Sequence, residues 1–250
     1  RPGSTFKPIT ATAGLNEGIV TGETTYTCHQ RMKFYDIEVG CTGYHNDISV
    51  AGALRVSCNI YFYELGRRLG IDKITEYASL YGYGQHTGIE TGDYAGAIGN
   101  PETFNDIGLD WTVGQVLQAA IGQSETSVTP LQMAGVASTI ANRGVRYKTH
   151  LVDSIYDYSM ENEIEKIEPE IAETIDINYD YVYDYVIDGM VQASENNFPA
   201  DYSLSNLGFD VAIKTGTPQN WRNGDEVTDS CFIGFAPADD PQIAFAGMIE

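Results

Sequence analysis

A serine and a lysine three residues apart stand at the very start of the chain, and their types suit acyl-transfer chemistry. They are Ser4 and Lys7, in the opening segment RPGSTFK. Positions i and i+3 lie on one face of a helix, so we expect the two side chains to come within hydrogen-bond reach. A serine hydroxyl needs an adjacent base, and a lysine can be that base when burial and nearby positive charge lower its pKa. The same spacing also occurs on ordinary solvated helix faces, so the rest of the chain must decide between the two interpretations.

Two further motifs follow in order, Ser57-Cys58-Asn59 and Lys214-Thr215-Gly216-Thr217. The first falls in a break between two predicted helices, and the second lies where a predicted strand runs into a turn. Functional side chains are often found where elements end. Each motif alone has an ordinary explanation as a loop serine or a surface lysine. The ordered set S-x-x-K, S-x-N and K-T-G is far more specific and indicates a serine acyl-transferase.

This ordered set resembles the transpeptidase domain of penicillin-binding proteins, the serine acyl-transferases that cross-link peptidoglycan. The resemblance extends over nearly the whole chain, through segments 2–8, 53–62, 122–132, 214–219 and 232–237. The segment 232–237, FIGFAP, is more similar to the monofunctional class B enzymes than to the bifunctional class A enzymes. The family usually has glycine at the position of Ser124, which lines the rim of the cleft.

The resemblance implies a role for each polar residue of the first two motifs. Ser4 Oγ attacks the carbonyl of the penultimate D-Ala of a stem peptide and releases the terminal D-Ala. Lys7 takes the proton of Ser4, which requires a neutral amine. Ser57 relays a proton to the leaving amine. Asn59 holds Lys7 and the substrate amide, since its side chain offers one acceptor and two donors.

The third motif is expected to bind substrate. Lys214 adds positive charge that keeps Lys7 neutral and attracts the substrate carboxylate. The hydroxyls of Thr215 and Thr217 are offered to the same carboxylate, and Gly216 lets the strand approach the substrate because it has no Cβ. The backbone amides of Ser4 and Thr217 form the oxyanion hole. We expect no cofactor and no metal in this reaction, and β-lactam antibiotics are implied as covalent inhibitors.

Three other functions use a similar motif set. A serine β-lactamase deacylates with water, but 210 positions separate Ser4 from Lys214 and no clear Glu-x-x-Leu-Asn stretch supplies a base for that water. A β-lactam sensor domain would acylate and stay acylated. A non-catalytic scaffold of cell-wall synthesis would have no need of both lysines.

The order of predicted elements indicates an α+β fold, in which an antiparallel sheet packs against a helical part, as in penicillin-binding proteins and β-lactamases. We predict one transpeptidase domain over residues 1–250: helices over about 1–144, an acidic β-rich segment and a helix over 145–200, and sheet strands over 205–250. Predicted helices include 4–15, with Pro8 in its first turn, 48–56 capped by Asp47, and one beginning at Pro130 after the N-cap Thr129. The family has strands before the first of these helices and a helix after the last strand, so we expect the chain to be truncated at both ends.

Charge excludes some partners. With 14 basic and 35 acidic residues the net charge is −21, which argues against nucleic acid and against anionic membranes. No run of about 18 apolar residues is present to span a bilayer. The family resemblance implies a location on the outer face of the bacterial cell membrane, with an anchor outside this chain and partners in a cell-wall synthesis complex. We interpret the acidic residues of 153–188 as a solvated surface rather than a cation site.

The four cysteines are Cys28, Cys41, Cys58 and Cys231, and their spacing matches no zinc-ribbon or redox pattern. Cys28 and Cys41 could form a disulfide in an oxidising compartment. A metal site formed by Cys28, His29, Cys41 and His45 is compatible with residue type, but its spacing is irregular. Cys58 and Cys231 are expected to be small buried hydrophobic residues.

Overall fold

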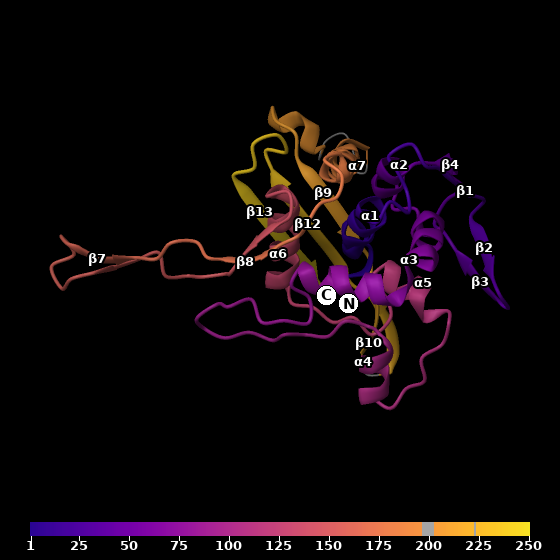
Figure 1. The fold of residues 1–250 in the computed structure, drawn as a ribbon, viewed down its shortest axis with the longest axis horizontal. Helices are drawn as coiled ribbons and strands as arrows, with labels where there is room; N and C mark the ends of the chain where they lie inside the picture. The colour runs from indigo at the N-terminus through magenta and orange to yellow at the C-terminus, as the bar shows by residue number, and fades with distance from the viewer. Residues whose placement is uncertain (197–202, 223) are drawn as a thin grey trace.

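The computed structural model describes residues 1–196, 203–222 and 224–250. Figure 1 shows a helical body beside a three-stranded sheet, with one long two-stranded arm that leaves the body. The two main layers agree with the predicted α+β arrangement. Within the described residues no helix is long and apolar enough to cross a membrane.

The helix that carries Lys7 is the centre of the helical body. A 3-10 turn, η1 (Gly3–Phe6), leads into α1 (Lys7–Asn16), and all ten residues of α1 are buried. Pro8 lies in the first turn of α1, as predicted, where its missing amide has no intrahelical partner. A helix buried on every side must be covered by neighbours; α1 packs on α3 (Asn59–Leu80), which also contacts α5 (Gln115–Ala120).

Helix boundaries confirm some predictions and correct others. Thr129 caps α6 (Pro130–Ala141), as predicted, and the structure adds a capping box with Gln132. Ser49, not Asp47, caps α2 (Val50–Arg55), because Asp47 belongs to β4 (Asn46–Ile48), which pairs with β1 (Tyr26–Cys28). The short α4 (Pro101–Asp106) was not predicted.

The sheet has the order β13-β12-β9 and is antiparallel throughout. Its strands are β9 (Ala212–Gly216), β12 (Ser230–Ala236) and β13 (Ile243–Ile249), and all three lie within the range 205–250 predicted for the sheet. Helices α6 and α7 (Val182–Asn196) contact these strands. A hairpin of β10 (Gln219–Arg222) and β11 (Asp225–Thr228) is inserted between β9 and β12.

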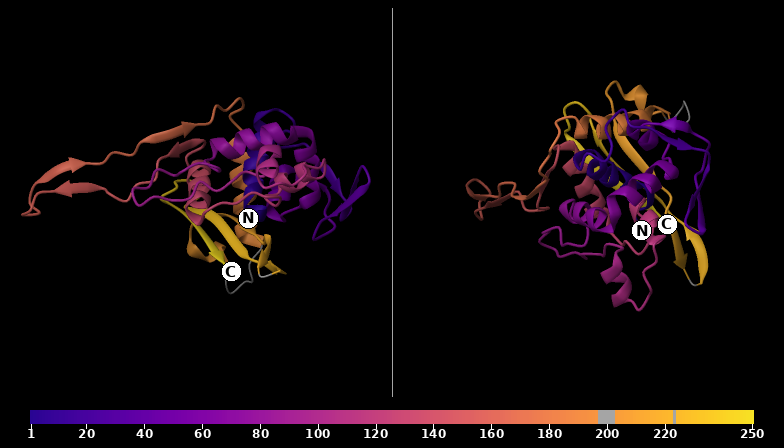
Figure 2. Two further views of the ribbon diagram at one scale, coloured as in Figure 1. Left: turned by 90° about the horizontal axis from the view of Figure 1, so that it is seen from below. Right: turned by 45° about the vertical axis from the view of Figure 1, so that its right-hand side comes forward.

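Two hairpins extend from the body. The arm seen in Figures 1 and 2 contains β5 (Val145–Tyr147), paired with β8 (Ile171–Thr174), and further out β6 (Ser154–Tyr156), paired with β7 (Glu163–Lys166). All four residues of β7 are exposed, which agrees with the predicted solvated acidic hairpin. The second hairpin, β2 (Arg31–Phe34) with β3 (Ile37–Gly40), lies beside α3 on the opposite side of the molecule.

Candidate active site and metal centre

Lys7 is fully buried and its amine is surrounded by acceptors. Lys7 Nζ donates to Ser57 O at 2.7 Å, to Ser57 Oγ at 3.0 Å and to Asn59 Oδ1 at 2.6 Å. Ser57 occupies the break between α2 and α3, and Asn59 is the first residue of α3. Three acceptors match the donor capacity of a lysine amine, so these contacts hold Lys7 Nζ in one position.

Lys214 approaches the same serine from the sheet. Its Nζ donates to Ser57 Oγ at 3.1 Å and to Thr215 O at 2.9 Å, and its side chain is fully buried in the middle of β9. Ser57 Oγ therefore lies between two lysine amines. Ser57 has a φ of 55°, a left-handed conformation that is unfavourable for a residue with a side chain. Such strain is typical of functional sites.

Ser4 lies half-buried in the η1 turn, directly before the helix that carries Lys7. Within the described residues its hydroxyl has no hydrogen-bond partner, and Lys7 makes its contacts to Ser57 and Asn59 instead of Ser4. The turn is held by Thr5 Oγ1, which donates to Pro2 O at 2.8 Å, and by Gly3 N, which donates to Gly122 O at 2.8 Å. The expected direct contact between Ser4 and Lys7 is therefore absent from this resting arrangement, and the hydroxyl of Ser4 is free to meet a substrate.

The expected mechanism requires a neutral Lys7 and a charged Lys214. Burial lowers the pKa of both lysines. For Lys7, burial is the main cause and the charge of Lys214 adds to it, so the pKa lies well below its usual value of 10.5. For Lys214, burial lowers the pKa to about 8. Lys7 can thus give up its proton more readily than an ordinary lysine and serve as a base, while Lys214 keeps most of its charge at neutral pH.

These directions predict a bell-shaped pH profile for acylation. We expect the rate of acylation by a penicillin to rise as Lys7 loses its proton, and to fall roughly tenfold per pH unit well above pH 8, where Lys214 loses its charge. Unfolded Lys214 binds a proton up to about pH 10.4. The unfolded state therefore holds more protons between about pH 8 and pH 10.4, and the free energy of unfolding should rise with pH in that window.

Stopped-flow labelling with a fluorescent penicillin, with circular dichroism at each pH, checks this profile. Labelling that keeps rising from pH 8 to pH 10 while the fold is unchanged would contradict the role given to Lys214.

Gly216 lets the strand lie against the turn that carries Ser4. A Cβ at Gly216 would lie 2.8 Å from Cys231 Sγ, 2.9 Å from Pro2 O and 3.2 Å from Ser4 N. Two of these contacts are shorter than real Cβ contacts, and Pro2 O is backbone that cannot simply rotate away. Glycine at this position therefore sets the distance between β9 and the amide of Ser4.

Gly216→Ala should push β9 away from the Ser4 turn. We expect a loss of about 1–3 kcal/mol in the free energy of unfolding, as for other overpacked sites, and acylation slower by about tenfold or more, since small displacements of catalytic groups are costly. Gly135→Ala is the matched control, because a Cβ there meets nothing within 4 Å in α6; it should be neutral or slightly stabilising. Urea unfolding and penicillin labelling measure both effects, and a variant equal to the parent in both would refute this role of Gly216.

The structure separates the two threonines of the third motif. Thr215 points to the opposite face of β9 from Lys214, because successive side chains of a strand alternate, and it lines an apolar cavity with Ile213 and Phe232. Within the described residues its hydroxyl makes no hydrogen bond to the lysine cluster, and the contact between Thr215 and the substrate carboxylate stays a prediction. Thr217 follows the strand, is exposed, and stays a candidate for that contact.

Ser124 stands in the loop that supports the η1 turn. It has a φ of 51°, and the nearby Gly122 has a φ of 69°. A left-handed backbone favours glycine, which gives a physical reason for the glycine expected at this position. Ser124 is buried and its hydroxyl contacts Gln115 Oε1 at 3.4 Å.

A second cluster lies directly behind the S-x-N motif and was only partly foreseen. Ligand atoms of Cys28, Cys41, His45 and Cys58 all lie within 4.8 Å of one another. All four cysteines are free thiols, so the considered Cys28–Cys41 disulfide is absent. His29 stacks on Tyr44 and is not in the cluster; Cys58, expected to be an inert hydrophobic residue, takes its place.

The cluster has the dimensions of a tetrahedral zinc site. A Zn²⁺ ion with Zn–S bonds of about 2.3 Å and a Zn–N bond of about 2.0 Å requires edges of roughly 3.8 Å between sulfurs and 3.5 Å between sulfur and nitrogen. The separation of Cys41 Sγ and Cys58 Sγ is 3.9 Å, and His45 Nδ1 lies 3.5 Å from Cys28 Sγ and 3.6 Å from Cys41 Sγ. Three thiols and one imidazole therefore fit Zn²⁺ in both chemistry and spacing.

The cluster is joined to the catalytic motif by the backbone. Cys58 lies between Ser57 and Asn59 in the chain, and the Asn59 amide donates to Cys41 Sγ at 3.2 Å. Hydrogen bonding with Cys58 lowers the pKa of Cys41, which favours the thiolate that a metal binds. The sequence signal for this site was the cysteine inside the S-x-N motif itself.

The fold and the lysine cluster define a class of serine acyl-transferase, and comparison with known proteins gives the family. The family described as "Penicillin binding protein transpeptidase domain" matches residues 1–250, and the chain belongs to this family. The chain is similar to peptidoglycan D,D-transpeptidase MrdA of Acinetobacter baumannii, with 28% identity over all of this chain and 39% of the relative. It is also 32% identical to stage V sporulation protein D of Bacillus subtilis, over 97% of this chain and 37% of the relative.

Solved structures support the same fold. The crystal structure of Pseudomonas aeruginosa PBP2 in complex with WCK 5153 has a TM-score of 0.86 at 30% identity, covering all of this chain and 56% of that one. Penicillin-binding protein A of M. tuberculosis, solved as its penicillin G acyl-enzyme complex, has a TM-score of 0.82 at 25% identity, covering all of this chain and 55% of that one. The fold prediction is therefore confirmed. The chain spans between 37% and 49% of the first three curated relatives.

Proposed function

We propose that this chain is the catalytic part of a peptidoglycan D,D-transpeptidase that cross-links stem peptides through an acyl-enzyme on Ser4. The observation that carries the proposal is the placement of Ser57 between Lys7 and Lys214, with Asn59 on Lys7. A scaffold without catalysis would have no reason to bury two lysines around one serine, because burying a charge is costly.

The first step forms the acyl-enzyme. Neutral Lys7 takes the proton of Ser4 while Oγ bonds to the carbonyl carbon of the penultimate D-Ala. The oxyanion is held by the backbone amides of Ser4 and Thr217. When the C–N bond breaks, Lys7 returns the proton through Ser57 Oγ, 3.0 Å away, to the nitrogen of the leaving D-Ala. The products are an ester on Ser4 and free D-Ala.

The second step transfers the acyl group to an amine of another stem peptide. That amine attacks the ester carbonyl and loses a proton to Lys7, and Ser4 Oγ leaves with a proton as the new peptide bond forms. Lys214 and Thr217 hold the terminal carboxylate of the donor before the first step. Each backbone donor to the oxyanion is worth roughly 10²–10³ in rate, so the register of β9 against η1 matters for both steps.

A D-amino-acid exchange assay tests this function. The unmodified chain should exchange the terminal D-Ala of a peptide ending in D-Ala-D-Ala for a labelled D-amino acid, and should keep a penicillin adduct for minutes or longer. Rapid hydrolysis of the penicillin would indicate a β-lactamase instead. A stable adduct without exchange would indicate a sensor, and neither adduct nor exchange would indicate a scaffold.

We also propose that Cys28, Cys41, His45 and Cys58 bind Zn²⁺ as a structural ion. The four protein ligands leave no open position, which is typical of structural rather than catalytic zinc. Its role here would be to fix Cys58, and with it the strained Ser57 and the first residue of α3. The chemistry of acyl transfer stays with the lysines and Ser57.

The similar proteins indicate the cellular location and the partners that we propose for this chain. One similar structure, at 27% identity and a TM-score of 0.85, is described as a peptidoglycan synthase complex that coordinates polymerization and crosslinking. We propose that this chain likewise works outside the cell membrane with partners of cell-wall synthesis, and is anchored by a segment outside residues 1–250. β-Lactams would act on it as substrate analogues that acylate Ser4.

A further inference from the structure

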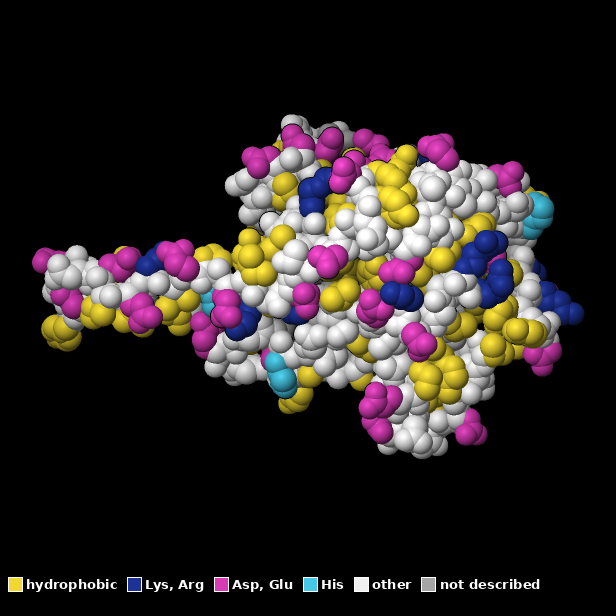
Figure 3. All heavy atoms as spheres, viewed as in Figure 1, with side chains coloured by type: hydrophobic (Ala, Val, Ile, Leu, Met, Phe, Trp, Pro, Cys, Tyr) yellow, Lys and Arg dark blue, Asp and Glu magenta, His cyan; other side chains and the backbone are white. Residues whose placement is uncertain are grey.

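The arm carries a large share of the exposed apolar side chains of this protein. Nine exposed large hydrophobic residues lie between positions 147 and 171, and among them Met160 and Ile164 are 72% and 66% exposed. Figure 3 shows yellow side chains along the lower edge of the arm, with magenta side chains of Asp and Glu beside them. Single exposed apolar side chains are ordinary, but a contiguous group of them marks a surface that another molecule covers.

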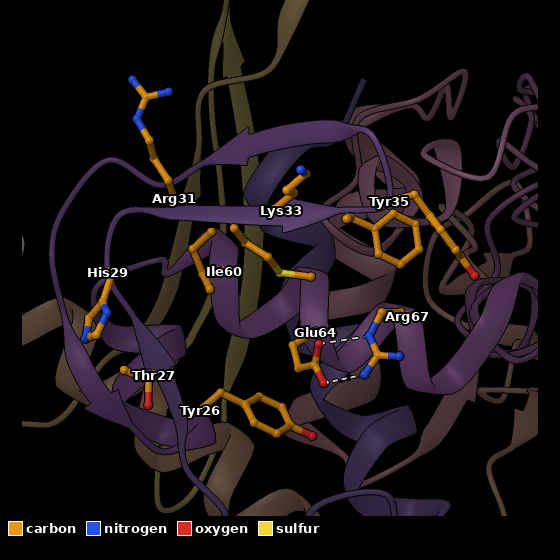
Figure 4. A pocket seen from close by; sticks show the side chains of 11 residues that line it. Tyr26, Thr27, His29, Arg31, Lys33, Tyr35, Ile60, Glu64 and Arg67 are labelled. Atoms are coloured by element: carbon orange, nitrogen blue, oxygen red, sulfur yellow. Dashed lines mark hydrogen bonds and ion pairs between the residues drawn. The ribbon is translucent and has the colours of Figure 1, made fainter.

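The β2–β3 hairpin, on the opposite side of the molecule, has its apolar side chains covered. Arg31 and Lys33 of β2 point to solvent, away from Ile60 of α3 (Figure 4). Met32 and Phe34 alternate with them and line the pocket under the hairpin together with Ile60. Among the described residues β6 and β7 pair only with each other, and an isolated two-stranded hairpin is at best marginally stable in water. The apolar side chains of β6 and β7 therefore stay exposed within this chain.

Apolar and acidic side chains are neighbours across the β6–β7 hairpin. Ile155 lies opposite Glu165, and Tyr156 lies opposite Glu163. Directly opposed residues lie side by side on one face of a sheet, and the Tyr156 hydroxyl accordingly donates to Glu163 Oε2 at 3.3 Å. A molecule that covers either apolar side chain therefore also covers a carboxylate.

The hairpin has too few cations for its carboxylates. Residues 153–168 contain six carboxylates and one lysine, Lys166, whose amine pairs with Asp153. Glu163 and Glu165 form no ion pair with any described side chain. Burying an ionised carboxylate without a partner is costly, so a molecule that covers the apolar neighbours of these glutamates must bring positive charge to them.

Charge excludes two other occupants of this surface. A second copy of the chain has the same net charge of −21 and would repel the arm. An anionic lipid surface would repel it for the same reason. A protein that is basic where it meets the arm is the class of partner that remains.

We infer that the β6–β7 hairpin is a docking site for a partner protein that presents an extended segment of alternating basic and apolar residues. The apolar residues of that segment cover Ile155 and Tyr156, and its Lys or Arg side chains pair with Glu163 and Glu165. Within the described part of the chain both outer edges of the hairpin lack a strand partner, so the segment adds to one edge as a further strand. The inference is independent of the proposed function.

A fluorescein-labelled peptide of alternating lysine and valine is the probe, and fluorescence anisotropy measures its binding to the unmodified chain. Glu163→Gln with Glu165→Gln should weaken binding about 2- to 30-fold, as expected for two exposed ion pairs. Ile155→Thr with Tyr156→Thr should weaken it at least about fivefold through lost apolar burial. Threonine favours strands, so the hairpin should persist, and circular dichroism checks that it does. Penicillin acylation should be equal in all of these chains, because none of the substituted residues belongs to the lysine–serine cluster.

The matched control tests whether the peptide simply follows the charge of an acidic protein. Asp106→Asn with Asp110→Asn makes the same change of charge at two exposed residues outside the arm, and this variant should bind like the parent. Equal weakening in the control, or unchanged binding in both hairpin variants, would overturn the docking site. So would equally tight binding of a lysine–serine peptide, which lacks apolar residues, or of a glutamate–valine peptide, which lacks cations.

The two excluded occupants are tested with the same variants. The unmodified chain should not sediment with vesicles of phosphatidylglycerol, and it should be monomeric in analytical ultracentrifugation at the concentrations used for binding. Sedimentation with vesicles that is lost in the Ile155/Tyr156 variant would assign the hairpin to a membrane surface instead. A dimer that dissociates in that variant would assign it to a second copy, and either result would overturn the basic partner.

Discussion

Ser4→Ala should abolish covalent labelling by a fluorescent penicillin, with a loss of at least about 10³-fold in rate. The nucleophile of a serine acyl-transferase cannot be replaced by the groups around it, and losses for such residues are among the largest known in enzymes. The fold should be unaffected, because the Ser4 hydroxyl has no hydrogen-bond partner within the described residues and its side chain is only half-buried. Gel fluorescence and mass spectrometry of the adduct measure the effect.

The control for Ser4→Ala is a serine far from the site. Ser159 lies near the tip of the arm, where its hydroxyl donates to Asp157 and accepts from the Glu161 amide, so Ser159→Ala should label like the parent. Peptide mapping of the parent should place the adduct on the peptide that contains Ser4. An adduct found on Ser57 or on another residue would show that the nucleophile has been misassigned.

Removal of zinc should lower stability and acylation together. The purified chain should contain about one equivalent of Zn²⁺ by plasma mass spectrometry, and Cys28→Ser should lose it. At free metal a thousandfold above the dissociation constant, binding contributes about 4 kcal/mol to stability, which corresponds to a fall of roughly 8–16 °C in Tm for a chain of this size. Acylation should slow as well, because the backbone of Cys58 positions Ser57 and Asn59.

Cys231→Ser is the control for the metal. Cys231 is buried beside Pro2 and is not part of the cluster, so this variant should retain its zinc. A chain that contains no zinc when expressed and purified in zinc-supplemented medium, and that is not stabilised by added Zn²⁺, would contradict the metal site.

Much of the catalytic centre could be read from the sequence because it depends on local motifs. The S-x-x-K pair fixes a lysine at the start of a helix, and Pro8 confines that start to the first turn. The K-T-G motif on a strand requires a neighbouring strand, and the antiparallel meander of β9, β12 and β13 was visible as alternating apolar segments. These features follow from backbone propensities that act over a few residues.

Other properties needed the tertiary structure. Lys214 and Thr215 are adjacent in the chain, yet Lys214 meets Ser57 whereas Thr215 lies on the opposite face of β9 and lines an apolar cavity. The N-cap of α2 is Ser49 and not the predicted Asp47, because Asp47 belongs to a strand that pairs with β1. Pairing of this kind depends on a partner distant in sequence, and local propensity cannot predict it.

The metal cluster shows most clearly what the sequence alone could not predict. The sequence presented His29 and His45 as equal candidates and Cys58 as an inert core residue. The folded chain stacks His29 on Tyr44 and brings Cys58 from the next motif to within 3.9 Å of Cys41.

The sequence by itself determined the reactive groups and their family, since these depend on residue types at short spacings. Only the tertiary structure decided that both lysines meet at Ser57 and that a four-ligand cluster lies behind it. The physical reason is that each of these sites joins segments tens to hundreds of residues apart, and packing alone sets the distances between them.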